Sequence, residues 1–152
     1  HTDTRFGRAQ DIRQKLAEMT GAEVIDTISK AEPIGPKRLL DCLVIAPCTG
    51  NTLSKLALGI TDTPVLMAAK AQLRNGRPLV IGIATNDGLS GSARNIATLL
   101  ARKNVYFVPY GQDDPKNKPT SLVARMCDTE RTVEEALAGK QVQPLLVEKW
   151  KD

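Results

Sequence analysis

The chain has 152 residues, of which 41% are hydrophobic and 25% charged, as in a globular domain large enough to bury a core. Its net charge is only +4, and aromatic residues make up 3%, so few side chains could stack on bases and nucleic-acid binding is not expected. No apolar run approaches the roughly 18 residues of a membrane-spanning helix, so we expect no membrane association and a cytoplasmic protein.

Three cysteines and one histidine limit the chemistry of the chain. Cys42, Cys48 and Cys127 lack the spacing of a zinc site, which predicts free thiols in a reducing compartment and no metal. His1 stands at the terminus, which argues against a Ser-His-Asp or Cys-His catalytic group. Without a histidine to activate it, Cys48 is interpreted as a small buried residue.

The N-terminal part predicts one helix followed by irregular structure. The helix is expected over about residues 4–19 and ends at Gly21, because four apolar residues recur at helical spacing: Ala9, Ile12, Leu16 and Met19. Residues 24–28 fit a short strand and a turn of helix equally well. A loop is expected at residues 33–36, which contain two prolines and a glycine.

Continuous apolar runs at residues 42–46, 79–84 and 105–108 are typical of parallel strands buried on both faces. The intervening segments predict three helices: one with Leu53, Leu56, Ala57 and Ile60; one from about Thr63 to Asn75; and one with Ile96, Leu99 and Leu100. A last long helix is expected to open at residues 119–121 and to end at Gly139. Its apolar face is Leu122, Met126, Val133 and Leu137. Residues 145–147 are expected to add a short strand.

This alternation predicts a single α/β domain over residues 1–152, with a three-layer, doubly wound parallel sheet of the flavodoxin or Rossmann type. Such sheets have five or more parallel strands, whereas three are evident here. We therefore expect a domain that is incomplete at its N-terminus, with a first strand and helix ahead of His1.

The strand at residues 42–46 delivers a polar turn to the edge of the sheet where ligands bind in this class of fold. The turn offers Pro47, Thr49, Gly50, Asn51 and Thr52 at the start of a helix, whose dipole favours a phosphate or a carboxylate. A turn that merely caps the helix explains the same residues equally well.

The strand at residues 79–84 delivers a second small, polar loop that includes Asn86, Gly88 and Ser90. It matches neither a Walker loop nor a G-x-G-x-x-G fingerprint, so the signal is weak. Lys55, Lys70 and Arg94 are candidate partners for the carboxylates of a substrate, although each also fits a solvent-facing charge. Asp113 and Asp114 fit a solvated turn better than an acid–base pair. No residue is identified as a catalytic base.

Residues 46–62, APCTGNTLSKLALGITD, resemble the flavoprotein family of homo-oligomeric flavin-containing cysteine decarboxylases. There a Pro-Ala-Ser-Ala-Asn-Thr turn precedes a Lys-Leu-Ala-x-Gly-Ile-x-Asp helix. The resemblance implies FMN or substrate bound at this turn and an assembly of several copies. A Pro-x-Met-Asn segment that closes over the substrate in the decarboxylases is replaced here, in our interpretation, by residues 67–71, which argues against cysteine decarboxylation.

One member of the family, from spore-forming bacteria, is similar over further segments: residues 4–7, 30–37, 61–78, 85–89 and 109–115. This resemblance implies an oxidoreductase subunit that works with a partner subunit on a small dicarboxylate, in the mother-cell cytoplasm. The nicotinamide cofactor would be bound through the partner. Two alternatives stay open: a stand-alone FMN-dependent decarboxylase or prenyltransferase-like protein, and a non-catalytic assembly subunit.

Overall fold

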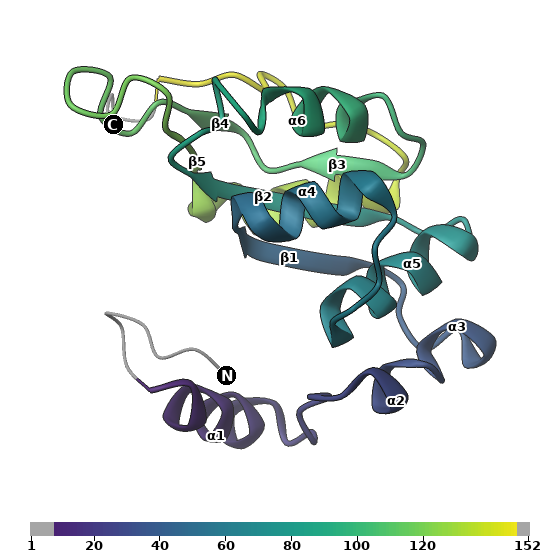
Figure 1. The fold of residues 1–152 in the computed structure, drawn as a ribbon. Coiled ribbons are helices and arrows are strands. Elements are labelled where there is room, and N and C mark those ends of the chain that lie inside the picture. Colours follow the sequence, from purple (N-terminus) through teal and green to yellow (C-terminus); the bar gives the residue numbers. More distant parts are fainter. Residues whose placement is uncertain (1–7, 149–152) are drawn as a thin grey trace.

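The computed structural model describes residues 8–148 and has a mixed α/β architecture (Figure 1). The strands are β1 (Leu43–Cys48), β2 (Leu79–Thr85), β3 (Val105–Phe107), β4 (Tyr110–Gly111) and β5 (Leu122–Ala124). The helices are α1 (Ala9–Thr20), α2 (Ile28–Ala31), α3 (Ile34–Lys37), α4 (Gly50–Leu58), α5 (Pro64–Arg74), α6 (Ala93–Leu100), the 3₁₀ turn η1 (Met126–Asp128) and α7 (Thr129–Leu137).

β2 is the central strand of the sheet. It pairs in parallel with β1 on one side and with β3 on the other, so that Leu79 lies opposite Leu43 and Val105. At its carboxyl end β2 also pairs antiparallel with β5, which in turn pairs antiparallel with β4. The predicted parallel sheet is therefore confirmed for its first three strands, while the pairing of the last two is antiparallel.

The helices form layers on the two faces of this sheet. α4 and α6 pack against each other and lie on one side of β2 and β3, as Figure 1 shows. A β-carbon on Gly82 would meet the sulfur of Met126 in η1, so this residue of β2 faces the other layer, to which α7 also belongs. Fully buried side chains of β2, β3, α4 and α6 fill the core between sheet and helices: Ile81, Ile83, Phe107, Leu53 and Leu99.

The prediction of a long helix that begins at residue 119 is wrong for its first ten residues. Residues 122–124 form β5, and α7 begins only at Thr129. Leu122 and Ala124 are buried on either side of the partly exposed Val123, which is the alternation of a strand. The residues that suggested one helix face thus belong to a strand, a 3₁₀ turn and a helix.

Four further expectations are corrected or decided by the structure. The loop expected at residues 33–36 contains the short helix α3, and residues 24–28 form no strand, since α2 begins at Ile28. β1 is not buried on both faces, because Val44 keeps 37% of its surface exposed. The expected strand at residues 145–147 is reduced to a single bridge between Leu146 and Tyr110.

α1 lies apart from the sheet, on the side where β1 forms the edge (Figure 1). The expected helix starts at Ala9, and residues 4–7 of the prediction lie outside the described part of the chain. None of its residues is buried, although its apolar residues recur at helical spacing. Within residues 8–148, β1 pairs only with β2, so its outer edge carries no hydrogen-bonded strand. The described chain thus leaves an apolar helix face and a strand edge open.

Candidate functional site

The junction between β1 and α4 brings polar groups to the carboxyl edge of the sheet. The strand continues through Pro47 and Cys48, so Thr49 alone separates it from the helix. Thr49 is the N-cap of α4, and its Oγ1 accepts a hydrogen bond of 3.5 Å from the main-chain N–H of Thr52. This arrangement satisfies one of the N–H groups that a helix start leaves without a partner.

The loop after β2 is organised by Asp87. Its main-chain carbonyl accepts hydrogen bonds from the N–H groups of Ser90 and Ser92, at 3.0 and 3.1 Å. Its carboxylate accepts hydrogen bonds from the hydroxyls of Thr85 and Ser92, and these bonds hold the pKa of Asp87 below its usual value. The carboxylate is therefore ionised at neutral pH and fixed in position at the end of the central strand.

Gly50 allows these two junctions to meet. A β-carbon at this position would lie 2.7 Å from the Oγ1 of Thr85, 3.1 Å from the Oδ1 of Asp87 and 3.3 Å from the Oγ of Ser92. Only a residue without a side chain lets the first turn of α4 approach the end of β2 this closely. One turn later, Ser54 accepts a 3.0 Å hydrogen bond from Asn95, which ties α4 to α6.

The two junctions enclose an open hollow of about 510 Å³. Its walls come from the start of α4 on one side and from the end of β2 on the other. The lining residues are Thr49, Gly50, Asn51, Ser54, Ala84, Thr85, Asn86 and Asp87. Hydroxyl, amide and carboxylate groups dominate this set, and its small residues leave room for a flat ligand at the sheet edge.

The structure brings together Thr49, Gly50, Asn51 and Asn86 of the predicted site. Other predicted residues lie near the hollow without lining it. Pro47 belongs to β1, Thr52 supports the cap, and Ser90 donates its hydroxyl to the carbonyl of Asp87. Gly88 is buried under Leu122, whose Cβ would lie 2.7 Å from a β-carbon on the glycine, so its place in the loop has a packing reason.

The three predicted cations do not line the hollow. Lys55 pairs with Asp62 at 2.6 Å toward the far end of α4. Lys70 lines a separate hollow of about 150 Å³ with Leu56, Leu66 and Arg102 among its other residues. Arg94 is exposed in the first turn of α6. Their roles toward a substrate carboxylate therefore stay predictions.

Sequence reasoning missed Ser54, Thr85 and Asp87. Ser54 follows Gly50 by four residues, which places both on one face of a helix, so spacing could have found it. Thr85 and Asp87 belong to the polar segment that was predicted at the end of the second strand. Their role in the site depends on the close approach of Gly50, which follows a different strand. Residues 67–71, interpreted as the counterpart of a substrate-closing segment, lie inside α5. The segment that follows β2 at this edge begins at Asn86.

The surroundings of Cys48 do not favour a reactive thiol. Cys48 is fully buried, and burial raises the pKa of its thiol to about 12, which agrees with its interpretation as a core residue. Within residues 8–148 no group of three or more His, Cys, Asp or Glu side chains could hold a metal ion. No helix in the same range is long and apolar enough to cross a membrane.

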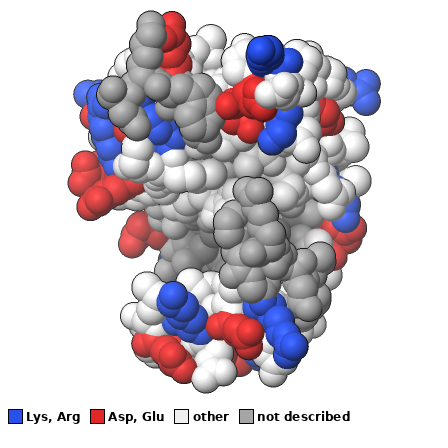
Figure 2. Space-filling view, turned by 90° about the vertical axis from the view of Figure 1, so that its left-hand side faces the viewer, with Lys and Arg blue, Asp and Glu red and all other residues white. Residues whose placement is uncertain are grey.

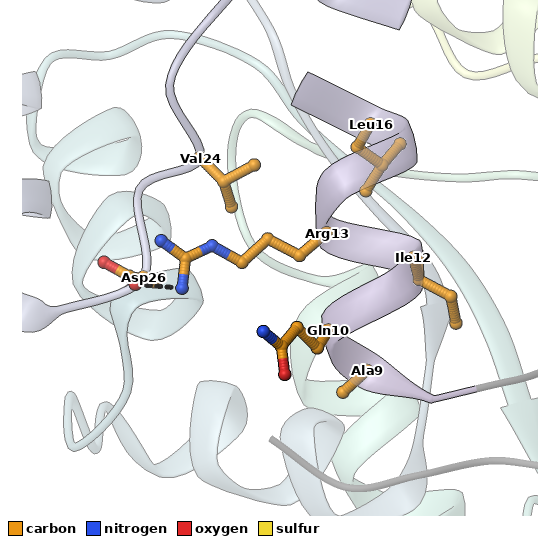
Figure 3. A pocket seen from close by; sticks show the side chains of 7 residues that line it. All are labelled: Ala9, Gln10, Ile12, Arg13, Leu16, Val24 and Asp26. Carbon is orange, nitrogen blue, oxygen red and sulfur yellow. Dashed lines mark ion pairs between the residues drawn. The ribbon is translucent and has the colours of Figure 1, made fainter. Parts of the chain in front are cut away.

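A larger hollow of about 560 Å³ lies beside α1 (Figure 3). Ile12, Leu16 and Val24 give it apolar walls, and its two charged residues, Arg13 and Asp26, neutralise each other in an ion pair of 2.8 Å. The space-filling view in Figure 2 shows the visible face hollowed between its upper and lower parts, with basic and acidic side chains interspersed. Because its charges are already paired and most of its walls are apolar, the hollow by α1 is a weaker candidate site than the carboxyl edge of the sheet.

A mostly parallel sheet with polar turns at its carboxyl edge defines a flavodoxin-like α/β protein. The model of the family described as Flavoprotein matches residues 4–134, and the chain belongs to this family.

Comparison with known proteins narrows the relationship. The chain is 54% identical over 149 residues to the B-type subunit of dipicolinate synthase of Bacillus subtilis (strain 168), a match that covers 98% of this chain and 74% of the relative. A crystal structure of the B-type subunit of dipicolinate synthase from Bacillus halodurans superimposes with a TM-score of 0.91 at 54% identity, covering 99% of this chain and 77% of that chain. The FMN-dependent cysteine decarboxylase SpaF shares the fold, with a TM-score of 0.60 at 20% identity, over 83% of this chain and 70% of that one.

The lining of the hollow can be tested against FMN, the cofactor that the family suggests. Hydroxyl and amide groups of Thr49, Asn51 and Asn86 suit the polar edge and hydroxylated chain of a flavin, and Gly50 admits a flat ring. The carboxylate of Asp87 can accept a ring N–H but repels a phosphate. The residues present therefore fit the ring and its hydroxyls, while a phosphate would be bound away from Asp87.

Proposed function

We propose that this chain is the B-type subunit of a dipicolinate synthase and that it works with the A-type subunit of the same enzyme. The pair would oxidise a tetrahydrodipicolinate-type intermediate to dipicolinate with a nicotinamide cofactor, during sporulation. The observation that carries this proposal is the 54% identity over 98% of the chain to a protein of that name. In this proposal the substrate would bind in the polar hollow at the carboxyl edge of the sheet.

The turn at the start of α4 is the part of this chain to which we assign ligand binding. Thr49, Gly50 and Asn51 would bind a carboxylate or phosphate through side-chain donors and main-chain N–H groups, with Thr52 supporting the cap. Asn86 would line the opposite wall. Each two-electron oxidation removes a hydride and a proton from the substrate, so these residues act by holding the ring in one orientation.

The cofactors and partners follow from the same proposal. The nicotinamide cofactor would be bound through the A-type subunit, and FMN is a further ligand suggested by the family. A bound flavin would supply a two-electron acceptor at the sheet edge. The protein would work in the mother-cell cytoplasm of a spore-forming bacterium, as a homo-oligomer in complex with the A-type subunit.

A second candidate function is an FMN-binding, decarboxylase-like flavoprotein. It is favoured by the fit of the hollow to a flavin ring and by membership of the family. A third candidate, a non-catalytic assembly subunit, leaves the polar hollow without a role. A yellow full-length protein that acts alone would support the second candidate over the first.

Reconstitution with purified components separates these candidates. Dipicolinate formation should be followed for the full-length protein together with the A-type subunit, and for each of the two components on its own. We expect product at a substantial rate only when both are present. Equal product without the present chain would reduce it to an accessory, and would overturn the proposed shared catalysis.

A further inference from the structure

The hollow of about 150 Å³, called the α4–α5 hollow below, lies between the end of α4, the helix α5 and the turn that follows α6. The buried residues Leu56 and Leu66 give it apolar walls. Pockets for drug-sized ligands measure about 300–1,000 Å³, so this smaller hollow suits a single aliphatic side chain. Leu58, which precedes the lining residue Gly59, is 72% exposed. An apolar hollow beside an exposed leucine is typical of a surface that binds another protein.

The charge around the α4–α5 hollow is positive and uncompensated. Lys70 and Arg102 line it from different elements, and within residues 8–148 neither forms an ion pair. The lining includes no acidic residue, and the carboxylate of Asp62 is already paired with Lys55 at 2.6 Å. Two unpaired cations beside an apolar hollow favour a partner that presents an aliphatic side chain next to carboxylates.

Helix α7 presents that combination on one face. Glu130, Glu134 and Leu137 follow one another at spacings of four and three residues, so they lie along one stripe of the helix. All three are exposed, Leu137 by 55%, and neither glutamate forms an ion pair in the described part of the chain. Arg131, the one cation of this helix, donates a hydrogen bond to the carbonyl of Gln143. The stripe therefore carries negative charge beside an exposed leucine.

We propose that α7 of one copy of this chain docks on the α4–α5 hollow of a second copy, with Leu137 inserted into the hollow and Glu134 beside Lys70 and Arg102. The two surfaces cannot meet within one copy, because α7 lies on the other face of the sheet from α4 and α6. Along the helix axis Glu134 lies about 4.5 Å from Leu137, within reach of cations at the rim of the hollow.

The two surfaces differ, so the contact is head-to-tail, and it closes into a ring or continues as an open chain of copies. The inference rests on the proposed function for its homo-oligomer and is independent of the reaction. It names the two surfaces through which the copies would associate.

Charge reversal tests this pairing. Self-association of the full-length protein would be measured by sedimentation equilibrium for the wild type, for Lys70→Glu/Arg102→Glu, for Glu130→Lys/Glu134→Lys and for the chain with all four substitutions. We expect each double variant to raise the dissociation constant about tenfold or more, because like charges then face each other. The four substitutions together restore the attraction, so that chain should associate nearly as tightly as the wild type.

Lys37→Glu/Lys116→Glu is the matched control, since it makes the same change in net charge as the first double variant, on exposed side chains outside both surfaces. It should leave self-association unchanged. Leu137→Ala should weaken self-association by itself, and it provides a second variant if a charge-reversed chain fails to fold. A monomeric wild type, double variants that associate like the wild type, or four substitutions that restore nothing would each overturn the inference.

Dipicolinate formation with the A-type subunit, measured on the same proteins, separates this inference from the proposed function. A monomeric wild type that still forms dipicolinate refutes the contact between copies and leaves the reaction standing. An oligomer that follows the charge reversals but forms no dipicolinate supports the contact and refutes the reaction. If Lys70→Glu/Arg102→Glu loses the A-type subunit and keeps self-association, the hollow binds that subunit and the contact between copies is refuted.

Discussion

The α-carbon of Gly50 lies so close to Thr85 that an added β-carbon would stand 2.7 Å from the threonine Oγ1. This contact joins the first turn of α4 to the last residue of the central strand. It sets the width of the hollow, because Asn51 follows the glycine and Asp87 follows the threonine. A small change at Gly50 should therefore alter the site more than it alters the core.

Gly50→Ala should push the start of α4 away from β2 and weaken ligand binding. We expect a loss of about 1–3 kcal/mol in the free energy of unfolding, as in other cases of overpacking. Urea denaturation of the single and double variants is the measurement. In Gly50→Ala/Thr85→Ala the nearest clashing atom is gone, so the two losses should sum to more than the loss of the double variant. Strict additivity would contradict the contact.

Two leucines that both recur at helical spacing differ in burial, so alanine substitution should lower the free energy of unfolding by different amounts. Leu53 in α4 is fully buried, so Leu53→Ala should lower the free energy of unfolding by about 2–5 kcal/mol. Leu16 in α1 is 49% exposed in the described chain, so Leu16→Ala should cost less than about 1 kcal/mol. Denaturation midpoints of the two variants test this ranking. A larger loss at Leu16 would mean that α1 is covered in solution.

Thiol labelling should distinguish Cys48 from Cys127. With a pKa of about 12, only about one Cys48 side chain in ten thousand is a thiolate at pH 8, and the residue is fully buried. Cys127 is exposed. A thiol reagent should therefore label Cys127 within minutes in the native protein, and Cys48 only after unfolding in urea. Equal labelling of both residues in the native state would contradict the buried position of Cys48.

The ionised Asp87 should stabilise the protein above mildly acidic pH. Hydrogen bonds from Thr85 and Ser92 lower the pKa of Asp87 in the folded chain, whereas the unfolded chain titrates near about 4. The stabilisation is therefore complete at neutral pH and is lost as the pH falls through the lowered value. The urea midpoint should decrease more between pH 7 and pH 3 in the wild type than in Asp87→Asn. An identical fall in both would show that this carboxylate is not involved.

The parts of the fold that the sequence predicted well depend on local signals. The continuous apolar runs at β2 and β3 required buried strands, and Thr63 with Pro64 marked the start of α5. β5 was missed because Leu122, Met126 and Val133 happen to recur at helical spacing. Its three residues become a strand only through pairing with the ends of β2 and β4, which no local pattern reveals.

In the candidate site, too, some residues have a local sequence signal and others depend on contacts between distant segments. Thr49, Gly50 and Asn51 could be predicted because a polar turn followed a buried strand directly. Asp87 could not, because its place in the site depends on the approach of Gly50 from a segment far away in the chain. Lys55 was predicted as a substrate ligand from its charge alone, whereas its pairing with Asp62 depends on how the chain turns after α4.

The rate of dipicolinate formation by the assembled enzyme, with Asn51→Ala in this chain, tests the central claim most directly. Asn51 is exposed and lines the hollow, so the substitution removes a ligand contact without disturbing the core. Asn117→Ala is the matched control, because Asn117 lies in an exposed loop where its side chain donates hydrogen bonds to Asp114. We expect a fall of about tenfold or more for Asn51→Ala with intact assembly, and no change for the control. An unchanged rate for Asn51→Ala would contradict the assignment of the hollow as the site.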